Sequence, residues 1–466
     1  MRTRHTRPSW SKICAGAVLA ALTWTSAEAG TPTPFAPPTN ADLVLYRDAI
    51  LVDGTGAPAR PHMDVLVSGE RILSVFSDAT RPAEATKAKV VDLHGKYLMP
   101  GLIDSHVHLA TPPNRRQAEA MLRRDLYGGV TAVRDMADDL RALGDITRAS
   151  RVGEIAASDV YYAALMAGPD FFTDPRTAQT TAGGEPGQVP WMQAVTDQTD
   201  LPLAVAWAAG TSATAIKLYA DLDSVLAGRI TAEAHRQHLR VWSHATLYPA
   251  KPSEVVAAGV DAISHACLLV RETDPQVPRW RQPRHPVDLD TFRAGDNPAL
   301  ARLFAVMVAS GTILDATVWT YGAAPPAGPS STPPLKPGSC DDVVGGAITR
   351  QAYRAGVQIS AGTDNVAPAS DPWPDLFHEL SALVDRAGLP PSAVIRSATL
   401  IGARAAGQER DMGSLEPGKL ANMIVLSKDP LASIDNLKTV VMIVKRGRAF
   451  SRADFVPLGD GDITDF

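Results

Sequence analysis

The stretch Gly101-Leu-Ile-Asp-Ser-His-Val-His108 is an apolar β-type run that ends in two histidines. Side chains two residues apart on a strand point to the same face, so His106 and His108 can hold one metal ion together. A histidine pair at one strand end is a weak signal, because two ordinary polar residues also occur there. The pair predicts a metal site only if further ligands from other strands meet it.

Beyond this stretch, short apolar runs alternate with longer helical stretches, a pattern typical of a parallel sheet wrapped by helices. Eight such runs favour a closed (β/α)8 barrel, a TIM barrel, over an open sheet. The predicted strands are Leu102–His106, Val130–Asp135, Asp159–Ala164, Ala215–Tyr219, Arg240–His244, Ala262–His265, Thr312–Thr317 and Gln358–Thr363.

The segments on both sides of the barrel show β rhythm again, so the two chain ends can share one small domain. The expected fold class is α/β, with a TIM barrel over residues 99–407 and a small β-sandwich from residues 41–98 plus 408–455. Residues 456–466 are left as a C-terminal tail. The predicted outer strands are Leu43–Tyr46, Ala49–Val52, Asp64–Ser68, Arg71–Phe76, Val90–Leu93, Ala421–Leu426 and Val440–Lys445.

The N-terminus has basic residues, an apolar run over Ile13–Trp24 and then Ala27-Glu28-Ala29, which is the order of a secretory signal peptide. Its roughly a dozen apolar residues fall short of the roughly 20 that a membrane-spanning helix needs. We therefore expect cleavage of residues 1–29 and an exported protein, periplasmic or secreted. Residues 30–40 are rich in Pro and Thr and predict an extended arm.

The composition is that of a globular protein, because 45% of the 466 residues are hydrophobic and 20% are charged. The net charge is -5, and no long run of one charge appears after the first dozen residues. Nucleic-acid binding through a basic face therefore has no support. Cys267 and Cys340 allow one disulfide but do not require it, and Cys267 is expected to be a small buried side chain. The long segments 173–190 and 321–338 are either binding loops or disordered.

Single polar residues recur at the ends of the later predicted strands, namely Lys217, His244, His265 and Asp364. All of them would lie at the C-terminal mouth of the barrel, where catalytic groups of this fold gather. Ionisable groups beside apolar strand residues are costly to bury unless they are paired or bound to a cation. Together with the histidine pair, these residues predict one shared metal centre.

This combination resembles the amidohydrolase superfamily of metal-dependent hydrolases, and within it the imidazolonepropionase-related and prolidase-like dipeptidase branch. The resemblance runs from about Ala41 to Arg448 and rests on three motifs besides the single ligands. They are Met99-Pro-Gly-Leu-Ile-Asp-Ser-His-Val-His108, Gly362-Thr-Asp364 and Gly413-Ser-Leu-Glu-Pro-Gly-Lys-Leu-Ala421.

The resemblance implies two divalent ions, most naturally zinc, although manganese or cobalt also suit such ligands. His106, His108 and Asp364 would hold the first ion, and His244 and His265 the second. A carboxylated Lys217 would bridge the ions, because a carbamate offers two oxygens whereas an ammonium has no lone pair. The alternative is an ordinary Lys217 ammonium paired with Asp221 or Asp364.

The resemblance also implies a catalytic role for Asp364, which would take the proton of the metal-activated hydroxide and pass it to the leaving amine. The sequence departs from the family at the third strand, where it lacks a histidine that polarises the substrate in some members. Tyr219, on the same strand face as Lys217, is the predicted replacement, and Tyr248 is a second substrate-binding candidate. Aromatic packing is the alternative for both tyrosines.

The implied activity is hydrolysis of a C–N amide or peptide bond in a small substrate, a dipeptide or an N-acyl amino acid. A cyclic amidase or lactonase with the same centre is one alternative, and a catalytically inactive metal- or ligand-binding relative is another. A deaminase is disfavoured because Ala245-Thr-Leu-Tyr248 follows His244 without the expected Glu. The expected partner is a small-molecule substrate, with no nucleic acid and no membrane after signal cleavage, and a homo-oligomer is left open.

Overall fold

The computed structural model describes residues 43–323, 340–365 and 371–457. The predicted signal peptide and Pro-rich arm lie outside these residues, as do most of the segment 321–338 and most of the C-terminal tail. The export prediction therefore stays a prediction. Among the described residues, no helix combines the length and the apolar character that crossing a bilayer requires.

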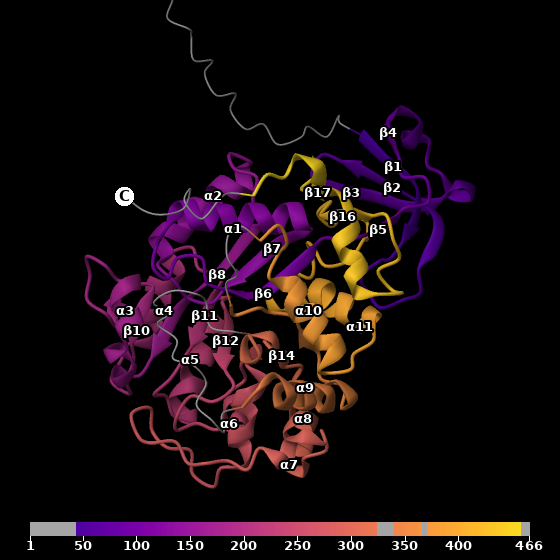
Figure 1. The fold of residues 1–466 in the computed structure, drawn as a ribbon. Coiled ribbons are helices and arrows are strands. Elements are labelled where there is room, and N and C mark those ends of the chain that lie inside the picture. Colours follow the sequence, from indigo (N-terminus) through magenta and orange to yellow (C-terminus); the bar gives the residue numbers. More distant parts are fainter. Residues whose placement is uncertain (1–42, 324–339, 366–370, 458–466) are drawn as a thin grey trace, which may run out of the picture. The chain divides into compact units, whose positions relative to one another are not determined.

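Eight parallel strands pair side by side around a nearly closed barrel (Figure 1). The ring is completed where Ser105 N donates to Ala361 O at 2.8 Å and Asp364 N donates to His106 O at 2.9 Å. All eight predicted strands are confirmed, with their ends shifted by a few residues. They are β6 (Leu102–Val107), β7 (Val130–Asp135), β8 (Asp159–Ala167), β11 (Ala215–Leu218), β12 (Arg240–His244), β13 (Ala262–Ser264), β14 (Ile313–Asp315) and β15 (Ile359–Ser360).

Helices cover the outside of the barrel, and their apolar faces explain why they pack there. In α5, Leu226, Ile230 and Ala234 recur at a spacing of four residues and are all buried. The Asp223 side chain starts this helix by accepting the N–H of Leu226. The main helices are α1 (Arg115–Gly128), α2 (Leu140–Val152), α4 (Leu201–Gly210), α5 (Ser224–Arg236), α6 (Pro252–Ala257), α8 (Pro298–Ser310), α9 (Asp342–Arg354) and α10 (Leu376–Asp385). Shorter ones are α3 (Pro175–Thr180), α7 (Asp290–Arg293), α11 (Pro391–Arg396) and α12 (Gly402–Ala405).

A second sheet combines strands from both parts of the chain that flank the barrel, in the order β18-β17-β16-β5-β1-β2-β3 with β4 beside β1. In Figure 1 the indigo strands β1 to β3 lie close to the yellow β16 and β17. The pairing is antiparallel except that β1 runs parallel to β4 and β5. The strands are β1 (Leu43–Leu51), β2 (Arg60–Ser68), β3 (Arg71–Ser77), β4 (Lys89–Asp92), β5 (Tyr97–Pro100), β16 (Met423–Leu426), β17 (Val440–Lys445) and β18 (Arg448–Ser451).

This arrangement confirms the predicted fold class and corrects some of its strands. Two predicted runs at the start of the domain form the single strand β1, because a register shift between Tyr46 and Ala49 lets the pairing with β2 continue. The strands β5 and β18 were not predicted. β5 is the strand that joins the two chain ends, since it pairs with β1 on one side and with β16 on the other.

The segment 173–190 is folded, which answers the question that the sequence left open. It contains α3 and the short strand β9 (Gln188–Val189), which pairs with β10 (Met192–Ala194). β10 in turn pairs in parallel with the end of β8. The segment is thereby fixed beside the C-terminal end of a barrel strand, close to the predicted site.

Candidate metal centre and active site

The six predicted ligands come together at the C-terminal ends of the barrel strands. Neighbouring imidazole rings lie close, with centroids 5.6 Å apart for His106 and His108, 4.9 Å for His106 and His265, and 4.7 Å for His244 and His265. Lys217 and Asp364 are near enough to attract each other electrostatically. The strands position these side chains as follows: His106 and His108 at the end of β6, Lys217 in β11, His244 in β12, His265 after β13 and Asp364 after β15.

Three histidines converge on the carboxylate of Asp364. Its Oδ1 lies 3.4 Å from His106 Nε2 and 3.5 Å from His108 Nε2, and its Oδ2 lies 3.7 Å from His265 Nδ1. Ligand atoms of a tetrahedral zinc site are about 3.4 Å apart. Within the described part of the chain, His106, His265 and Asp364 form the one group of metal-binding side chains whose ligand atoms all lie within 4.8 Å. This donor set fits a divalent cation.

Two buried carboxylates hold the outer nitrogens of the first histidine pair. His106 Nδ1 lies 2.8 Å from Asp315 Oδ2, and His108 Nδ1 lies 2.8 Å from Asp138 Oδ1. An ionised carboxylate only accepts hydrogen bonds, so each Nδ1 donates to its carboxylate, and Nε2 of each ring is the nitrogen on the side of Asp364. Such outer partners orient metal-binding histidines and raise their basicity. In His265 the arrangement differs, because the Thr317 hydroxyl lies 2.9 Å from Nδ1, the same nitrogen that lies 3.7 Å from Asp364 Oδ2.

Asp138, Asp315 and Thr317 were missed by the sequence reasoning, which looked only for ligands. Asp315 and Thr317 stand at the end of the seventh predicted strand, the one strand end in that region that contributed no candidate. Asp138 follows the second strand by three residues. The location of all three at or just after a strand end could have marked them as site candidates. It could not have shown whether they bind the metal or hold its ligands.

The backbone is strained where the strands deliver these groups. His265, Thr317 and Asp364 have φ values of 77°, 46° and 47°, a region that residues other than glycine rarely adopt. Each such residue costs on the order of 1–3 kcal/mol and persists where the surroundings impose it. These three residues follow β13, β14 and β15, respectively. The strain indicates that the barrel mouth positions these side chains at a cost in stability.

Lys217 is 1% exposed, and its Nζ donates to Ser264 Oγ at 3.4 Å. Ser264 Oγ passes the chain on to Asp315 Oδ2 at 2.9 Å. Burial lowers the pKa of Lys217 to about 7, although the charges of Asp315 and Asp364 oppose the shift. A considerable fraction of the amine is therefore neutral near pH 7. Asp221, the other predicted partner, instead accepts the backbone N–H of Asp170 at 3.0 Å.

Burial also keeps the second pair of histidines neutral. It lowers the pKa of His265 to about 3 and that of His244 well below its ordinary value. Burial opposes ionisation of Asp364, but the charge of His106 and the hydrogen bond of His108 outweigh it and lower the pKa of the carboxyl. His108 differs: burial opposes its protonation, but the charge of Asp138 and the hydrogen bond to it outweigh burial and raise the pKa of His108. A cation bound there would release this proton, since metal ligands must be deprotonated.

Tyr219 lies beside the centre, with its ring centroid 4.0 Å from that of His244. Arg176 Nη2 donates to its hydroxyl oxygen at 3.4 Å, so the hydroxyl proton is free for another acceptor. Tyr248 lies farther along the loop after β12, where its ring packs 5.9 Å from that of Trp280. Both tyrosines thus pack against the same Trp280 ring. Neither Trp280 nor Arg176 was predicted as part of the site.

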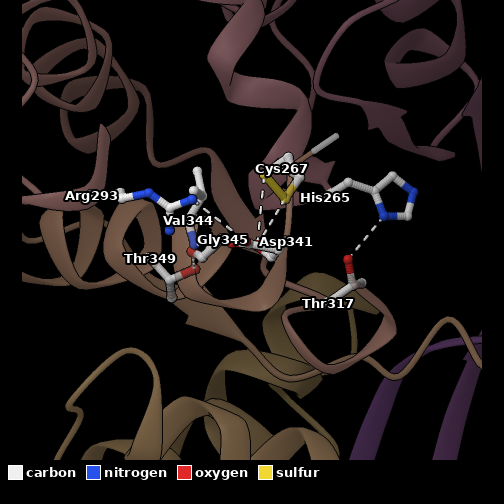
Figure 2. The surroundings of a disulfide bond; sticks show 9 residues. His265, Cys267, Arg293, Thr317, Asp341, Val344, Gly345 and Thr349 are labelled. Atoms are coloured by element: carbon white, nitrogen blue, oxygen red, sulfur yellow. Dashed lines mark hydrogen bonds and ion pairs between the residues drawn. A yellow bond between two sulfur atoms is a disulfide. The ribbon is translucent and has the colours of Figure 1, made fainter. Parts of the chain in front are cut away.

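A disulfide joins Cys267 to Cys340 (Figure 2). Cys267 is buried as expected, with 4% of it exposed. Its partner directly precedes Asp341, which caps the start of α9 by accepting the N–H of Val344. The bond therefore ties the turn that follows His265 to the beginning of a barrel helix. The sequence allowed this bond but did not require it.

Residues 346–450 match the amidohydrolase family, a segment that includes Asp364 and the C-terminal strands. A segment of 111 residues is 37% identical to the 5-methylthioadenosine/S-adenosylhomocysteine deaminase of Teredinibacter turnerae, covering 22% of this chain and 23% of that protein. The imidazolonepropionase of Symbiobacterium thermophilum is 33% identical over 105 residues, covering 22% of this chain and 24% of that protein. The chain thus matches about a quarter of the length of these relatives.

The likeness extends over nearly the whole described chain when folds are compared. The crystal structure of a Xaa-Pro dipeptidase with methionine bound in its active site superposes with a TM-score of 0.64 at 19% identity. It covers 88% of this chain and 100% of that one. At this identity the likeness concerns the fold. Residues 346–450 therefore match the amidohydrolase family, and the described chain shares the fold of a Xaa-Pro dipeptidase.

Proposed function

We propose that this protein is an exported metal-dependent hydrolase that cleaves a C–N amide or peptide bond in a small substrate, a dipeptide or an N-acyl amino acid. The convergence of His106, His108 and His265 on Asp364 carries this proposal. It gathers nitrogen and oxygen ligands with the spacing that a divalent cation requires. The names of the relatives, a deaminase and an imidazolonepropionase among them, support an activity of this broad class.

The proposed centre has two ions, preferably zinc, with a carboxylated Lys217 between them. The lowered pKa of Lys217 supports this, because a neutral amine is the form that reacts with carbon dioxide to give a carbamate. His106, His108 and Asp364 would hold one ion, and His244 and His265 the other. The position of His244 next to His265 supports the second group.

When bound, the ions would lower the pKa of water and polarise the carbonyl of the substrate. The residues of the chain would handle the protons. Asp364 would accept the proton of the attacking water and release it to the leaving amine, since its carboxylate is ionised and faces the ligands. Tyr219 would donate its free hydroxyl proton to the developing oxyanion, while Arg176 holds the phenol oxygen from the other side.

The test is elemental analysis of the purified mature protein together with activity on a panel of dipeptides, N-acyl amino acids, cyclic amides and lactones. We expect about two ions per chain, lost together with hydrolysis of a C–N bond after chelation and regained on reconstitution. Asp364→Asn should lose turnover by orders of magnitude, whereas Asp385→Asn on the exposed face of α10 should not. Unchanged turnover of the Asp364 variant would refute the assignment, and no activity despite bound metal would favour an inactive relative.

Export is proposed from residues 1–29 and has a separate test. The N-terminal sequence of the protein recovered from outside the cytoplasm should begin at Gly30. Recovery of the intact N-terminus in the cytoplasm would contradict export without touching the proposed chemistry. The proposed partner is the small substrate alone, and the mass of the native protein in solution would show whether it forms a homo-oligomer.

A further inference from the structure

The segment Arg279-Trp-Arg-Gln-Pro-Arg284 lies beside the candidate site, although the sequence reasoning gave it no role. Trp280 is its contact with the site. The Trp280 ring centroid lies 5.7 Å from Phe171, 6.4 Å from Tyr219 and 5.9 Å from Tyr248. Since Tyr219 contacts His244, one aromatic ring separates Trp280 from the candidate ligands. Together these four aromatic side chains form an apolar wall at one side of the centre.

Arg284 belongs to this wall through its guanidinium group. The group lies 3.6 Å over the centroid of the Tyr248 ring and 5.2 Å from that of Trp280. Its Nη1 donates to the backbone oxygens of Arg279 and Gln282 at 3.0 and 3.2 Å. These bonds and the aromatic faces fix the orientation of the side chain, which is partly buried.

The charge of Arg284 is not balanced by a carboxylate. Over residues 43–323, 340–365 and 371–457, no acidic oxygen lies within ion-pair distance of its guanidinium, whereas two nearby arginines, Arg176 and Arg281, have such partners. Arg176 pairs with Asp174 at 2.8 Å, and Arg281 pairs with Asp170 at 3.5 Å. Burial lowers the pKa of Arg284, which shows that the surroundings of the group work against its charge.

An oriented, partly desolvated guanidinium without a counter-ion is suited to bind a carboxylate, because its planar fork matches the two oxygens. The aromatic wall next to it offers apolar area to a side chain on the same ligand. A cationic ligand would be repelled from this corner, so the site selects by charge as well as by shape.

We propose that Arg284 determines specificity by binding the free carboxylate of the substrate, while Trp280, Tyr219 and Phe171 contact its apolar or aromatic side chain. This inference rests on the proposed function and narrows it to N-acyl amino acids and dipeptides with a free carboxylate and an aromatic or large apolar residue. The amide carbonyl would then face His244 and Asp364, on the side of Tyr219 away from Trp280.

The first test compares N-acetylphenylalanine with its carboxamide as substrates. The wild type should prefer the acid about 10- to 100-fold in kcat/KM, as expected for hydrogen bonds to a charged group. Arg284→Met should remove this preference by raising KM for the acid, with kcat and metal content changed little. Arg284→Lys should recover part of the preference, and Arg281→Met is the matched control that should keep all of it. Equal use of acid and carboxamide by the wild type would overturn the proposal.

The second test measures binding without hydrolysis, by calorimetry on the full chain carrying Asp364→Asn. N-acetylphenylalanine should bind about 10-fold or more tightly than its carboxamide, and adding Arg284→Met should abolish the difference. If the binding difference depends on Arg284 but the metal-loaded wild type hydrolyses no amide, the proposed function is refuted and the carboxylate site is kept. Amide hydrolysis without any effect of Arg284 would keep the function and refute the carboxylate site.

Discussion

Each histidine of the pair on β6 turns Nε2 inward because a buried carboxylate holds Nδ1. For His108 this carboxylate is Asp138, which is 0% exposed and also accepts the N–H of Ala110 at 2.6 Å. Asn in place of Asp138 would keep one acceptor but lose the charge that favours the Nδ1–H form of the ring. We expect Asp138→Asn to weaken metal binding about 10- to 100-fold, measured by competition with a chromophoric chelator.

The neighbouring Asp139 supplies the control for this variant. It caps α2 by accepting the N–H of Arg141, and Asn caps a helix as well as Asp does. Asp139→Asn should therefore leave the metal affinity close to the wild type, although it weakens the ion pair of Asp139 with Arg141. If Asp138→Asn binds metal as tightly as this control, the outer carboxylate does not govern the orientation of His108.

At the level of single residues, the sequence predicted the candidate ligands but not the residues that hold those ligands in place. His106, His108, Lys217, His244, His265 and Asp364 stand at strand ends, and a regular (β/α)8 barrel brings all strand ends of one direction together. Whether Asp138 meets His108, or Arg284 meets Tyr248, depends on loops whose path no local pattern determines. The pairing of Cys267 was open for the same reason, since it is made by a residue 73 positions away.

The disulfide links the turn after His265 to the start of α9, which are 73 residues apart in the sequence. It closes a loop of 73 residues, for which chain entropy predicts a stabilisation of about 4 kcal/mol. Replacing both Cys267 and Cys340 with Ser should lower the free energy of unfolding by about this amount in urea titrations. The wild type in reductant should match the double variant. If the oxidised and reduced wild type are equally stable, opening the loop does not increase the conformational entropy of the unfolded chain.

Helix α1 carries a buried acid that makes stability depend on pH. Burial raises the pKa of Asp125 from 3.8 to about 7. The folded state therefore holds this proton more tightly than the unfolded state, so stability falls as pH rises from about 4 to 7. Asp125→Asn removes the effect. It should stabilise the protein by about 2–3 kcal/mol more at pH 8 than at pH 5 in urea unfolding.

Asp385→Asn serves as the control for Asp125, because Asp385 is exposed on α10. Its effect on the free energy of unfolding should be small and the same at both pH values. A stabilisation by Asp125→Asn that does not change with pH would mean that the gain comes from packing rather than from the carboxyl group.

Elements with strong periodicity were predicted closely, and those defined by their partners were not. The run Val130–Asp135 is buried on both faces and reads as a strand on its own. β5 is four residues long and exists because β1 and β16 flank it. β9 and β10 have two and three residues, below the length at which alternation can be recognised. Tertiary pairing rather than local preference creates these short strands.

The small domain and the barrel meet at a group of charges far from the candidate centre. Asp159, at the start of β8, binds Lys445 Nζ through Oδ1 and Arg446 Nε through Oδ2, both at 2.9 Å. Arg446 also reaches Glu70 in the turn after β2 at 3.2 Å. The candidate ligands lie at the C-terminal ends of the parallel strands, whereas Asp159 is the first residue of β8 and so lies at the opposite end of the barrel. This group therefore joins both chain ends to the barrel without taking part in binding.

Removing the shared acid should test whether these charges hold the molecule together. Asp159 and Lys445 are 2% and 5% exposed, so Asp159→Asn would leave two cations without their buried counter-ion. We expect a loss of about 3–5 kcal/mol in the free energy of unfolding, measured in urea. The exposed pair of Asp197 and Arg229 is the control, because Asp197→Asn should cost less than about 1 kcal/mol. Metal content should stay at the wild-type level wherever the variant is folded, and metal loss before unfolding would show that the two ends of the barrel are coupled.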